Sequence, residues 1–349
     1  MLLSIILCTT GMVYAQSFEV AKYGGDFLSV GGGARALGMG SAQVAMRGDV
    51  TSAYWNVAGL ADVDDLQVIY MHSERFSGIV GYDYGAVALP VKHTGGVFAI
   101  SFFRQGVDNI KNTLNAWDRD RNLPRQNPQD YITEFSTADA AIFISYSARR
   151  SDQLSWGATA KLVNSRLGPF ANAWGYSLDL GALYQTPLVN VGVNLMDIST
   201  MMKFWNVNEN KLKGLSQNYG DTIPTGQNEL VLPTIKIGAS RLFTFNDFKF
   251  TTATDVDMRF EGRRAYYLNV GDVSFEPHVG GELTYKDKIS FRAGVTDFTD
   301  NFGSGFTVSP TLGAGFYIHK VQLDYGFASF AGATSDLGFT HRISLKVTI

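Results

Sequence analysis

The chain of 349 residues has one cysteine, nine prolines and little charge. The cysteine, Cys8, lies in an N-terminal apolar run that we expect to be removed, so the mature protein would have no thiol for disulfides, metal ligation or nucleophilic catalysis. Charged residues make up 17% of the chain, against roughly 25% in an average soluble domain. The formal net charge of -3 provides no basic excess, so nucleic acid is not an expected partner.

Residues 1–15 are predicted to be a signal peptide for export. The stretch from Leu2 to Leu7 is mostly apolar, and Val13-Tyr14-Ala15 forms a cleavage site before Gln16. No Lys or Arg precedes the apolar run, which departs from the usual pattern. After residue 16 no run approaches the ~18 consecutive apolar residues of a membrane-spanning helix. A membrane location therefore requires β-strands.

The chain is rich instead in glycine and aromatic residues, with 37 Gly, 16 Tyr and 24 Phe. Segments of about ten residues alternate between apolar and polar side chains, as strands do when one face meets lipid and the other a lumen. In the last segment the odd positions from Phe339 to Ile349 are apolar except for His341, and the even positions from Thr340 to Thr348 are polar. This period of two residues indicates a strand, because a helix repeats every 3.6 residues.

The alternation predicts about fourteen strands. They lie at 66–75, 80–91, 95–106, 137–149, 153–166, 173–186, 189–197, 231–243, 247–259, 272–284, 287–297, 305–317, 319–329 and 337–349. The predicted fold class is all-β transmembrane: an antiparallel outer-membrane β-barrel of about 14 strands at 66–349, preceded by a small, partly helical hatch at 16–65. The predicted location is the bacterial outer membrane.

A soluble sandwich or soluble barrel is the alternative, because its strands also alternate. The export signal, strands near the ~9 to 11 residues of a tilted membrane crossing, and aromatic residues near predicted strand ends favour the membrane barrel. These aromatic residues are Tyr82, Tyr84, Phe102, Phe103, Phe243, Phe245, Phe316 and Tyr317.

The connections between predicted strands are of two kinds. Turns such as 150–152, 187–188 and 246 are short, whereas 107–136, 198–229 and 261–271 are long and polar. In barrels of this class short turns face the periplasm and long loops the exterior. Exposed aromatic residues commonly anchor contacts with a partner. The candidate partner-contact residues in the two longest loops are Trp117, Tyr131, Phe204, Trp205 and Tyr219.

Residues 16–65 do not alternate and are small and glycine-rich, so we expect them to fold into the lumen as a plug, where small residues permit close approach to the wall. The candidate hatch residues are Arg35, Gly38, Met39, Gly40, Asp49, Tyr54, Trp55 and Asn56.

Two motifs in this segment carry a resemblance to a known family. The run Gly33-Ala-Arg-Ala-Leu-Gly-Met-Gly-Ser-Ala, followed by Ala53-Tyr-Trp-Asn-Val-Ala-Gly-Leu-Ala, resembles the N-terminal signature of the PorV/PorQ family, relatives of the FadL long-chain fatty-acid channel. The resemblance implies a fourteen-stranded barrel with an N-terminal hatch. Two features depart from it: Val57 stands where the family usually has proline, and the chain ends in Ile349 where many outer-membrane proteins end in an aromatic residue.

The resemblance leaves two functions open. PorV-like members work with the type IX secretion machinery, carrying or docking exported proteins at the cell surface through external loops, and PorQ-like members serve a related role. FadL-like relatives move hydrophobic small molecules through the hatch and a wall opening. We favour the secretion role, with secretion-machinery proteins or secreted cargo as partners; the alternative is passive transport. Transport predicts a continuous apolar path behind the hatch, whereas secretion predicts a plugged lumen and partner-binding loops.

The sequence shows no pattern for catalysis, a cofactor or a metal. Gly38-x-Gly40 lacks the strand and the Lys of a phosphate loop, and Gly303-Ser304-Gly305 reads as a turn rather than a nucleophile elbow. Asp118, Asp120 and Asn122 lack the Gly and Glu that complete a calcium loop. The five histidines, which show no paired spacing, are His72, His93, His278, His319 and His341.

Basic residues are predicted to serve two purposes. Those near strand ends should meet lipid headgroups or lipopolysaccharide phosphates: Arg149, Arg150, Lys161, Arg166, Arg263 and Arg264. By parity, Arg292, Arg342 and Lys346 should point into the lumen, where they could pair with Asp324 or with a hatch carboxylate such as Asp49.

Overall fold

The computed structural model describes residues 18–349 except 22–23, 92, 94, 224–225, 227, 263–267, 301–305 and 330–337. The predicted signal peptide, Arg263, Arg264 and the Gly303-Ser304-Gly305 turn lie outside the described residues.

Fourteen antiparallel strands in the described part of the chain form a closed barrel. Each strand pairs with the next along the chain, and the last pairs with the first through Gln67↔Thr348 to Glu74↔His341. The strands are β2 (Gln67–Arg75), β3 (Val80–Val91), β4 (Gly96–Asn112), β7 (Thr133–Arg149), β8 (Leu154–Leu167), β9 (Ala171–Gln185), β10 (Asn190–Met196), β13 (Thr234–Phe245), β14 (Phe248–Arg259), β16 (Val273–Tyr285), β17 (Ile289–Asp300), β18 (Phe306–Ile318), β19 (Val321–Ser329) and β20 (Phe339–Thr348). The predicted fold class and all fourteen predicted strands are confirmed.

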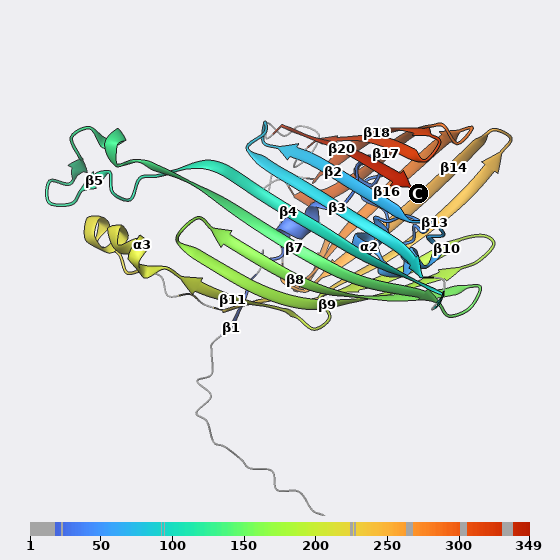
Figure 1. Cartoon of the computed structure of the whole chain (residues 1–349), viewed down its shortest axis with the longest axis horizontal. Helices are drawn as coiled ribbons and strands as arrows, with labels where there is room; N and C mark the ends of the chain where they lie inside the picture. The colour runs from blue at the N-terminus through green and yellow to red at the C-terminus, as the bar shows by residue number, and fades with distance from the viewer. Residues whose placement is uncertain are drawn as a thin grey trace, which may run out of the picture.

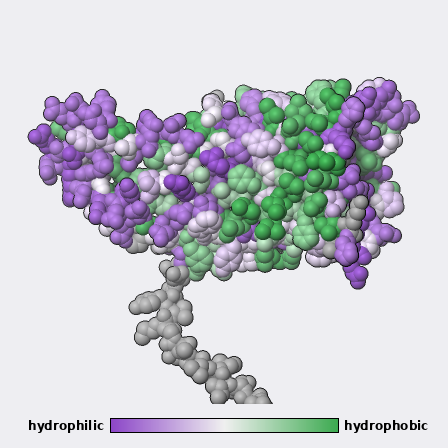
Figure 2. Space-filling view, viewed as in Figure 1, coloured by the Kyte–Doolittle hydropathy of each residue, from purple (hydrophilic) through white to green (hydrophobic). Residues whose placement is uncertain are grey.

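The two faces of the wall differ as the alternation predicts. On β20, Ile343 and Leu345 are exposed on the outer face, whereas Arg342 and Ser344 are buried inside. On β9, exposed Tyr184 and Trp174 are ten residues apart. At about 3.3 Å per residue and a tilt of about 40°, they bracket about 25 Å, the height of an outer-membrane apolar band. Figure 2 shows hydrophobic residues gathered across the wall, with hydrophilic residues toward both ends of the molecule.

The wall is irregular where β10 gives way to β11 (Met201–Val207). β11 continues to pair with β9, and it also pairs with β12 (Asn228–Val231), which precedes β13. β1 (Phe18–Val20) adds to the free edge of β12 in parallel. The assignment of Phe204 and Trp205 to a loop is therefore wrong: both lie on β11, because the period of two continues there with Met201 and Lys203 buried and Phe204 exposed.

Two long connections protrude together at one end of the barrel (Figure 1). The connection after β4 contains β5 (Trp117–Asp118), β6 (Leu123–Pro124) and η3 (Pro128–Tyr131), and the connection after β11 contains α3 (Glu209–Gly214) and η4 (Leu215–Tyr219). The Asn218 side chain donates a hydrogen bond of 2.8 Å to the Leu114 carbonyl, so the two connections pack against each other. β15 (Leu268–Val270) lies in the third long connection. No helix among the described residues is long and apolar enough to cross a membrane.

The segment ahead of the wall lies inside the barrel, where Figure 1 shows α2 behind the front strands. Its elements are η1 (Asp26–Val30), α1 (Ala34–Gly38), α2 (Ser52–Trp55) and η2 (Val57–Asp62). Because each is only one or two turns long, propensity alone would not hold them, and their contacts with the wall must do so.

Three of the aromatic residues that the sequence places near strand ends do not face the membrane. Tyr82, Tyr84 and Phe103 face the lumen and are almost fully buried, whereas Phe102 faces outward. The physical reason is the hatch, which supplies apolar partners such as Tyr54 inside the barrel.

Candidate functional site

The hatch rests directly on glycines of the inner wall. Within the described wall, these glycines are Gly157, Gly181, Gly192, Gly238, Gly280, Gly294, Gly313 and Gly326. A Cβ atom at Gly280 would overlap the Met39 carbonyl, and one at Gly326 would lie 2.6 Å from the Ala34 carbonyl oxygen. Gly40 has a φ of 62° and leaves no room for a side chain against Val279. Only glycine permits this backbone-to-backbone seat, which is the close approach that the sequence predicts.

One side of the hatch is held by buried charges. Arg35 of α1 bonds to Glu282 of β16 at 2.7 Å, and Glu282 also accepts a hydrogen bond of 2.5 Å from Arg292 of β17. Arg292 in turn lies 2.7 Å from Asp324 of β19. The prediction that a lumenal basic residue pairs with Asp324 is thus confirmed for Arg292, and Arg35 connects the hatch to this pair. Charges so far from water remain ionised only because each meets an opposite charge.

A second buried ion pair joins Asp49 to the last strand. Lys346 Nζ lies 2.6 Å from Asp49 Oδ2, which confirms the predicted link between Lys346 and a hatch carboxylate. Burial alone would raise the pKa of Asp49, but Lys346 and Arg35 hold it well below its usual value. Arg342 of β20 instead donates hydrogen bonds to the carbonyl oxygens of Val30 (2.9 Å) and Gly33 (3.3 Å). A cation of the wall is thus also hydrogen-bonded to the hatch backbone.

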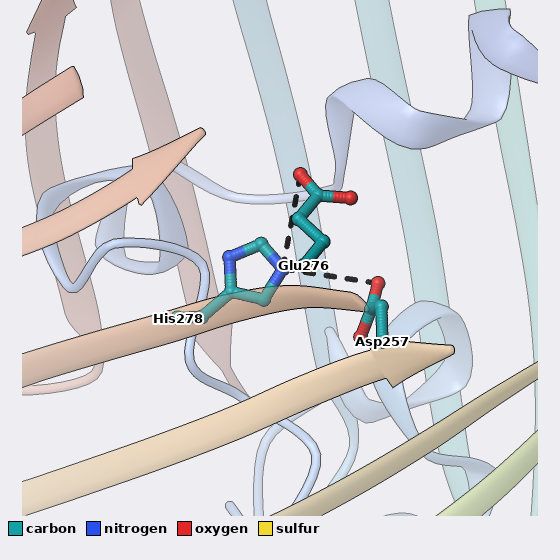
Figure 3. A group of neighbouring side chains, drawn as sticks. All are labelled: Asp257, Glu276 and His278. Atoms are coloured by element: carbon teal, nitrogen blue, oxygen red, sulfur yellow. Dashed lines mark ion pairs between the residues drawn. The ribbon is translucent and has the colours of Figure 1, made fainter. Parts of the chain in front are cut away.

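A third polar group contains three side chains that could bind a metal. Asp257, Glu276 and His278 place one ligand-type atom each within 4.8 Å of one another (Figure 3). His278 Nε2 lies 3.8 Å from Asp257 and 4.0 Å from Glu276, while its Nδ1 lies 3.0 Å from the Gly40 carbonyl oxygen, to which it can only donate. Sequence spacing misses this group because its members come together only through the register of β14 with β16.

Neighbouring cations decide the chemistry of this group. Lys236 Nζ lies 2.5 Å from Asp257, and Arg259 Nε lies 3.7 Å from Glu276. A divalent ion would have to approach both positive charges, so the arrangement favours an ion-pair network over a metal site. Through His278 and Gly40 this network becomes a third attachment of the hatch to the wall.

The opposite side of the hatch is apolar. We call the contact between the hatch and strands β2, β3, β4, β7 and β8 the apolar seam. Ring centres lie 6.1 Å apart for Phe27 and Phe103, 6.2 Å for Tyr54 and Phe103, and 6.1 Å for Tyr54 and Phe143. These side chains belong to one buried cluster that extends through Tyr84 and Met71. The hatch is therefore fixed by buried charges on one side and mainly by apolar packing on the other. On the apolar side, Gln67 and Ser147 add hydrogen bonds to the hatch backbone, and Arg149 forms an exposed ion pair with Asp62.

A cavity of about 480 Å³ lies against the apolar seam at the end that carries the long connections, and we call it the vestibule. Phe27 of the hatch and Trp205 of β11 line it. Lys203 also lines it, 3.3 Å from Glu229 and 5.3 Å from the centre of the Trp205 ring. The vestibule thus offers an aromatic and a charged wall, and Phe27 belongs to both the vestibule and the seam.

The predicted site residues fall into two groups. All eight candidate hatch residues lie inside the barrel; Met39, Asp49, Tyr54, Trp55 and Asn56 are buried. Of the candidate partner-contact residues, Tyr131 and Tyr219 are exposed at the ends of η3 and η4, Trp117 is half-buried in β5, Phe204 faces outward on β11, and Trp205 lines the vestibule.

One buried trio was not expected. Lys161, predicted to meet lipid headgroups, points inward and lies 2.8 Å from Asp179 and 2.6 Å from Asp197. Its expected position is wrong because Lys161 lies mid-strand on the inward parity of β8. Asp197 belongs to the turn between β10 and β11, so the trio ties that turn to β8 and β9.

No protein-family model matches the sequence, and no curated protein matches it. Solved structures match the fold. The toluene transporter TodX of Pseudomonas putida is 12% identical, with a TM-score of 0.55 over 91% of this chain and 97% of that one. A monoaromatic hydrocarbon channel, CymD, is 15% identical, with a TM-score of 0.56 over 92% and 98%. The toluene transporter TbuX of Ralstonia pickettii is 11% identical, with a TM-score of 0.50 over 91% and 97%. At these identities the likeness establishes the barrel fold that these structures share, and no more.

Proposed function

We propose that this chain is a passive outer-membrane channel for small hydrophobic compounds, the alternative of the two functions that the sequence left open. The observation that carries the proposal is the continuity of the vestibule with the apolar seam through Phe27. The fold shared with two toluene transporters and a hydrocarbon channel over more than nine-tenths of this chain supports it.

The asymmetry of the hatch suggests how passage occurs. A compound that enters the vestibule meets Phe27 and Trp205, which favour apolar and aromatic ligands. The seam beyond is filled by side chains, so the compound must displace rings such as Phe103 and Tyr54. Packing contacts can be exchanged for contacts with an apolar guest at little cost, whereas the buried ion pairs opposite cannot be broken cheaply. The seam therefore opens while the charged side stays attached.

A reversible lock on the hatch tests the proposal. The backbone N–H of Ala34 donates a hydrogen bond of 3.2 Å to Ser344 Oγ, so cysteines at these two positions, A34C/S344C, place thiols on α1 and β20 within reach of a disulfide. The matched control T284C/S290C joins two wall strands whose hydroxyls lie 2.6 Å apart. Uptake of radiolabelled toluene and of oleate is measured in cells expressing each variant. We expect oxidation to abolish uptake only in A34C/S344C, and reductant to restore it.

Unchanged uptake by the locked variant, with the cross-link verified by mass spectrometry, would contradict a hatch-gated channel. Phe103→Ala tests whether uptake depends on the seam itself. It should raise uptake, because it removes a ring that fills part of the path. The control is Phe102→Ala, which removes a ring from the outer face of the same strand and should leave uptake unchanged.

A docking role in protein secretion, with the PorV/PorQ resemblance behind it, is the second candidate. It is favoured by the two protruding connections, which pack against each other through Asn218 and Leu114 and expose Tyr131 and Tyr219. Gentle detergent extraction of the chain and of a Y131A/Y219A variant separates the two roles. Docking is supported if a secretion pore or cargo is recovered with the unmodified chain but not with Y131A/Y219A. The hatch lock should leave that recovery unchanged.

A further inference from the structure

A groove on the outer face of the wall crosses β13, β14, β16 and β17. Its volume is about 610 Å³, within the ~300 to 1,000 Å³ typical of small-molecule sites. The register aligns Arg241 with Thr252, Thr252 with Gly281, and Gly281 with Ala293, so these four residues form one row on the outer face. Thr252, Gly281 and Ala293 are three small residues in succession, and they form the floor of the groove.

Larger side chains border this floor on both sides. The next row toward the turn at Asn246 contains Phe243 and Phe250, and the Phe250 ring lies 3.4 Å from where a Cβ at Gly281 would be. The row on the other side contains Val279 and Val295. The hydrogen-bonded ladder is unbroken beneath the floor, so the groove leads along the surface and not into the lumen.

One end of the groove carries a charge that faces lipid. Arg241 is exposed, and its guanidinium lies 4.6 Å from the centre of the Phe243 ring. Among the described residues, no carboxylate forms an ion pair with Arg241. An arginine on the lipid face costs about 2–4 kcal/mol at the middle of the membrane and much less near its boundary, where it can meet an anion.

The place of Arg241 in the wall identifies that anion. Arg241 lies on the outer face of β13, two residues farther than Phe243 from the short turn that joins β13 to β14. Short turns mark the periplasmic end of such barrels. Figure 1 shows this turn at the end of the barrel opposite the long connections. Lipids with phosphate headgroups form the periplasmic leaflet, whereas lipopolysaccharide lies in the outer one.

We propose that the groove binds one anionic phospholipid of the periplasmic leaflet. Its phosphate meets the Arg241 guanidinium and the Thr252 hydroxyl, and one acyl chain lies over Gly281 and Ala293 between Phe250 and Val279. The site is separate from the vestibule and seam, so it stands whether or not the chain is a channel.

Native mass spectrometry of the detergent-extracted protein, titrated with phosphatidylglycerol, tests this site. The unmodified chain should retain one phosphatidylglycerol molecule in preference to phosphatidylethanolamine. G281L/A293L fills the floor and should abolish retention; the contact at Gly281 leaves outward room for the new side chain. Arg241→Met should weaken retention by about tenfold or more, because a charged hydrogen bond to phosphate is lost.

The matched control is Arg104→Met, which removes an arginine from the outer face of β4, where it lies 3.8 Å from Asp83. It should retain phosphatidylglycerol as the unmodified chain does. Equal retention by G281L/A293L, equal loss in Arg104→Met, or equal affinity for phosphatidylethanolamine would each overturn the proposal. A heat-dependent shift in gel mobility verifies that every variant is folded.

Discussion

Gly280 and Gly281 are neighbours on β16 that face opposite sides of the wall. A side chain at Gly280 would overlap the Met39 carbonyl of the hatch, whereas one at Gly281 would make an ordinary contact with Phe250. At the scale of the residue, the same amino acid therefore has two purposes: inside the barrel it permits the hatch to seat on bare backbone, and outside it shapes a surface groove.

This difference gives a paired prediction. Gly280→Ala should destabilise hatch seating by about 1–3 kcal/mol, the usual cost of overpacking, whereas Gly281→Ala should be close to neutral. Limited proteolysis of residues 24–65 in detergent measures the effect, since a displaced hatch becomes accessible to protease. Equal protection in the two variants would contradict the seating of Met39 on Gly280.

A second prediction concerns the ion pair between Asp49 and Lys346. Because the pKa of Asp49 is lowered in the folded protein, its ionisation stabilises the hatch at pH values above its unfolded pKa of about 3.9, and this stabilisation is lost as the pH falls toward the folded value. The difference in thermal stability between the unmodified chain and Asp49→Asn should be constant from pH 7 to about pH 5 and shrink below about pH 4. A difference that instead grew on acidification would contradict the assignment.

At the scale of the element, the weak point of the wall is the passage from β10 to β11. The turn at Asp197–Thr200 interrupts the strand, and both of its ends have positive φ angles, 53° at Asp197 and 60° at Thr200. Lys161 compensates from β8 by binding Asp197 and Asp179 together, and Ser177 donates a further hydrogen bond of 2.6 Å to Asp197. The ion pairs of Lys161 thus hold the wall together where the hydrogen-bonded ladder is interrupted between β10 and β11.

Removing this charge has a predictable effect. Lys161→Met leaves two buried carboxylates without their cation and should destabilise the barrel by about 3–5 kcal/mol, whereas Lys111→Met, which breaks an exposed pair with Glu134, should cost less than about 1 kcal/mol. Unfolding in urea, followed by tryptophan fluorescence, measures both. The triple variant K161M/D179N/D197N should recover part of the loss, because it removes the stranded charges.

The strands could be predicted from the sequence because one face of each strand meets lipid and the other meets polar groups. Apolar and polar residues therefore alternate along the strand with a period of two. That same rule fails where a second apolar surface lies inside: Tyr84 and Phe103 alternate correctly but point at the hatch, not at lipid. The pairs Lys346–Asp49 and Arg292–Asp324 were predictable from inward parity. Lys161 with its two aspartates was not, because three distant segments meet there only after the register is set.

At the scale of the whole molecule, the barrel has an apolar outer face and encloses a hatch that ion pairs fasten to the inner wall. In the described part of the wall, closure through β2 and β20 leaves no edge of the main ladder in the membrane, so unfolding must break the ring as a unit. The folded barrel should therefore survive unheated electrophoresis in detergent and migrate differently from the boiled chain.

The hatch should not be needed for this behaviour. Deleting residues 24–60 removes Arg35 and Asp49 and so leaves Glu282 and Lys346 without their hatch partners, but the cross-strand ladder and the pair Arg292–Glu282 remain. The truncated barrel should keep its heat-dependent shift at a lower transition temperature and admit small polar dyes that the intact chain excludes. Loss of the shift on deletion would mean that the hatch is a core on which the wall depends, and then the seam could not open without unfolding the barrel.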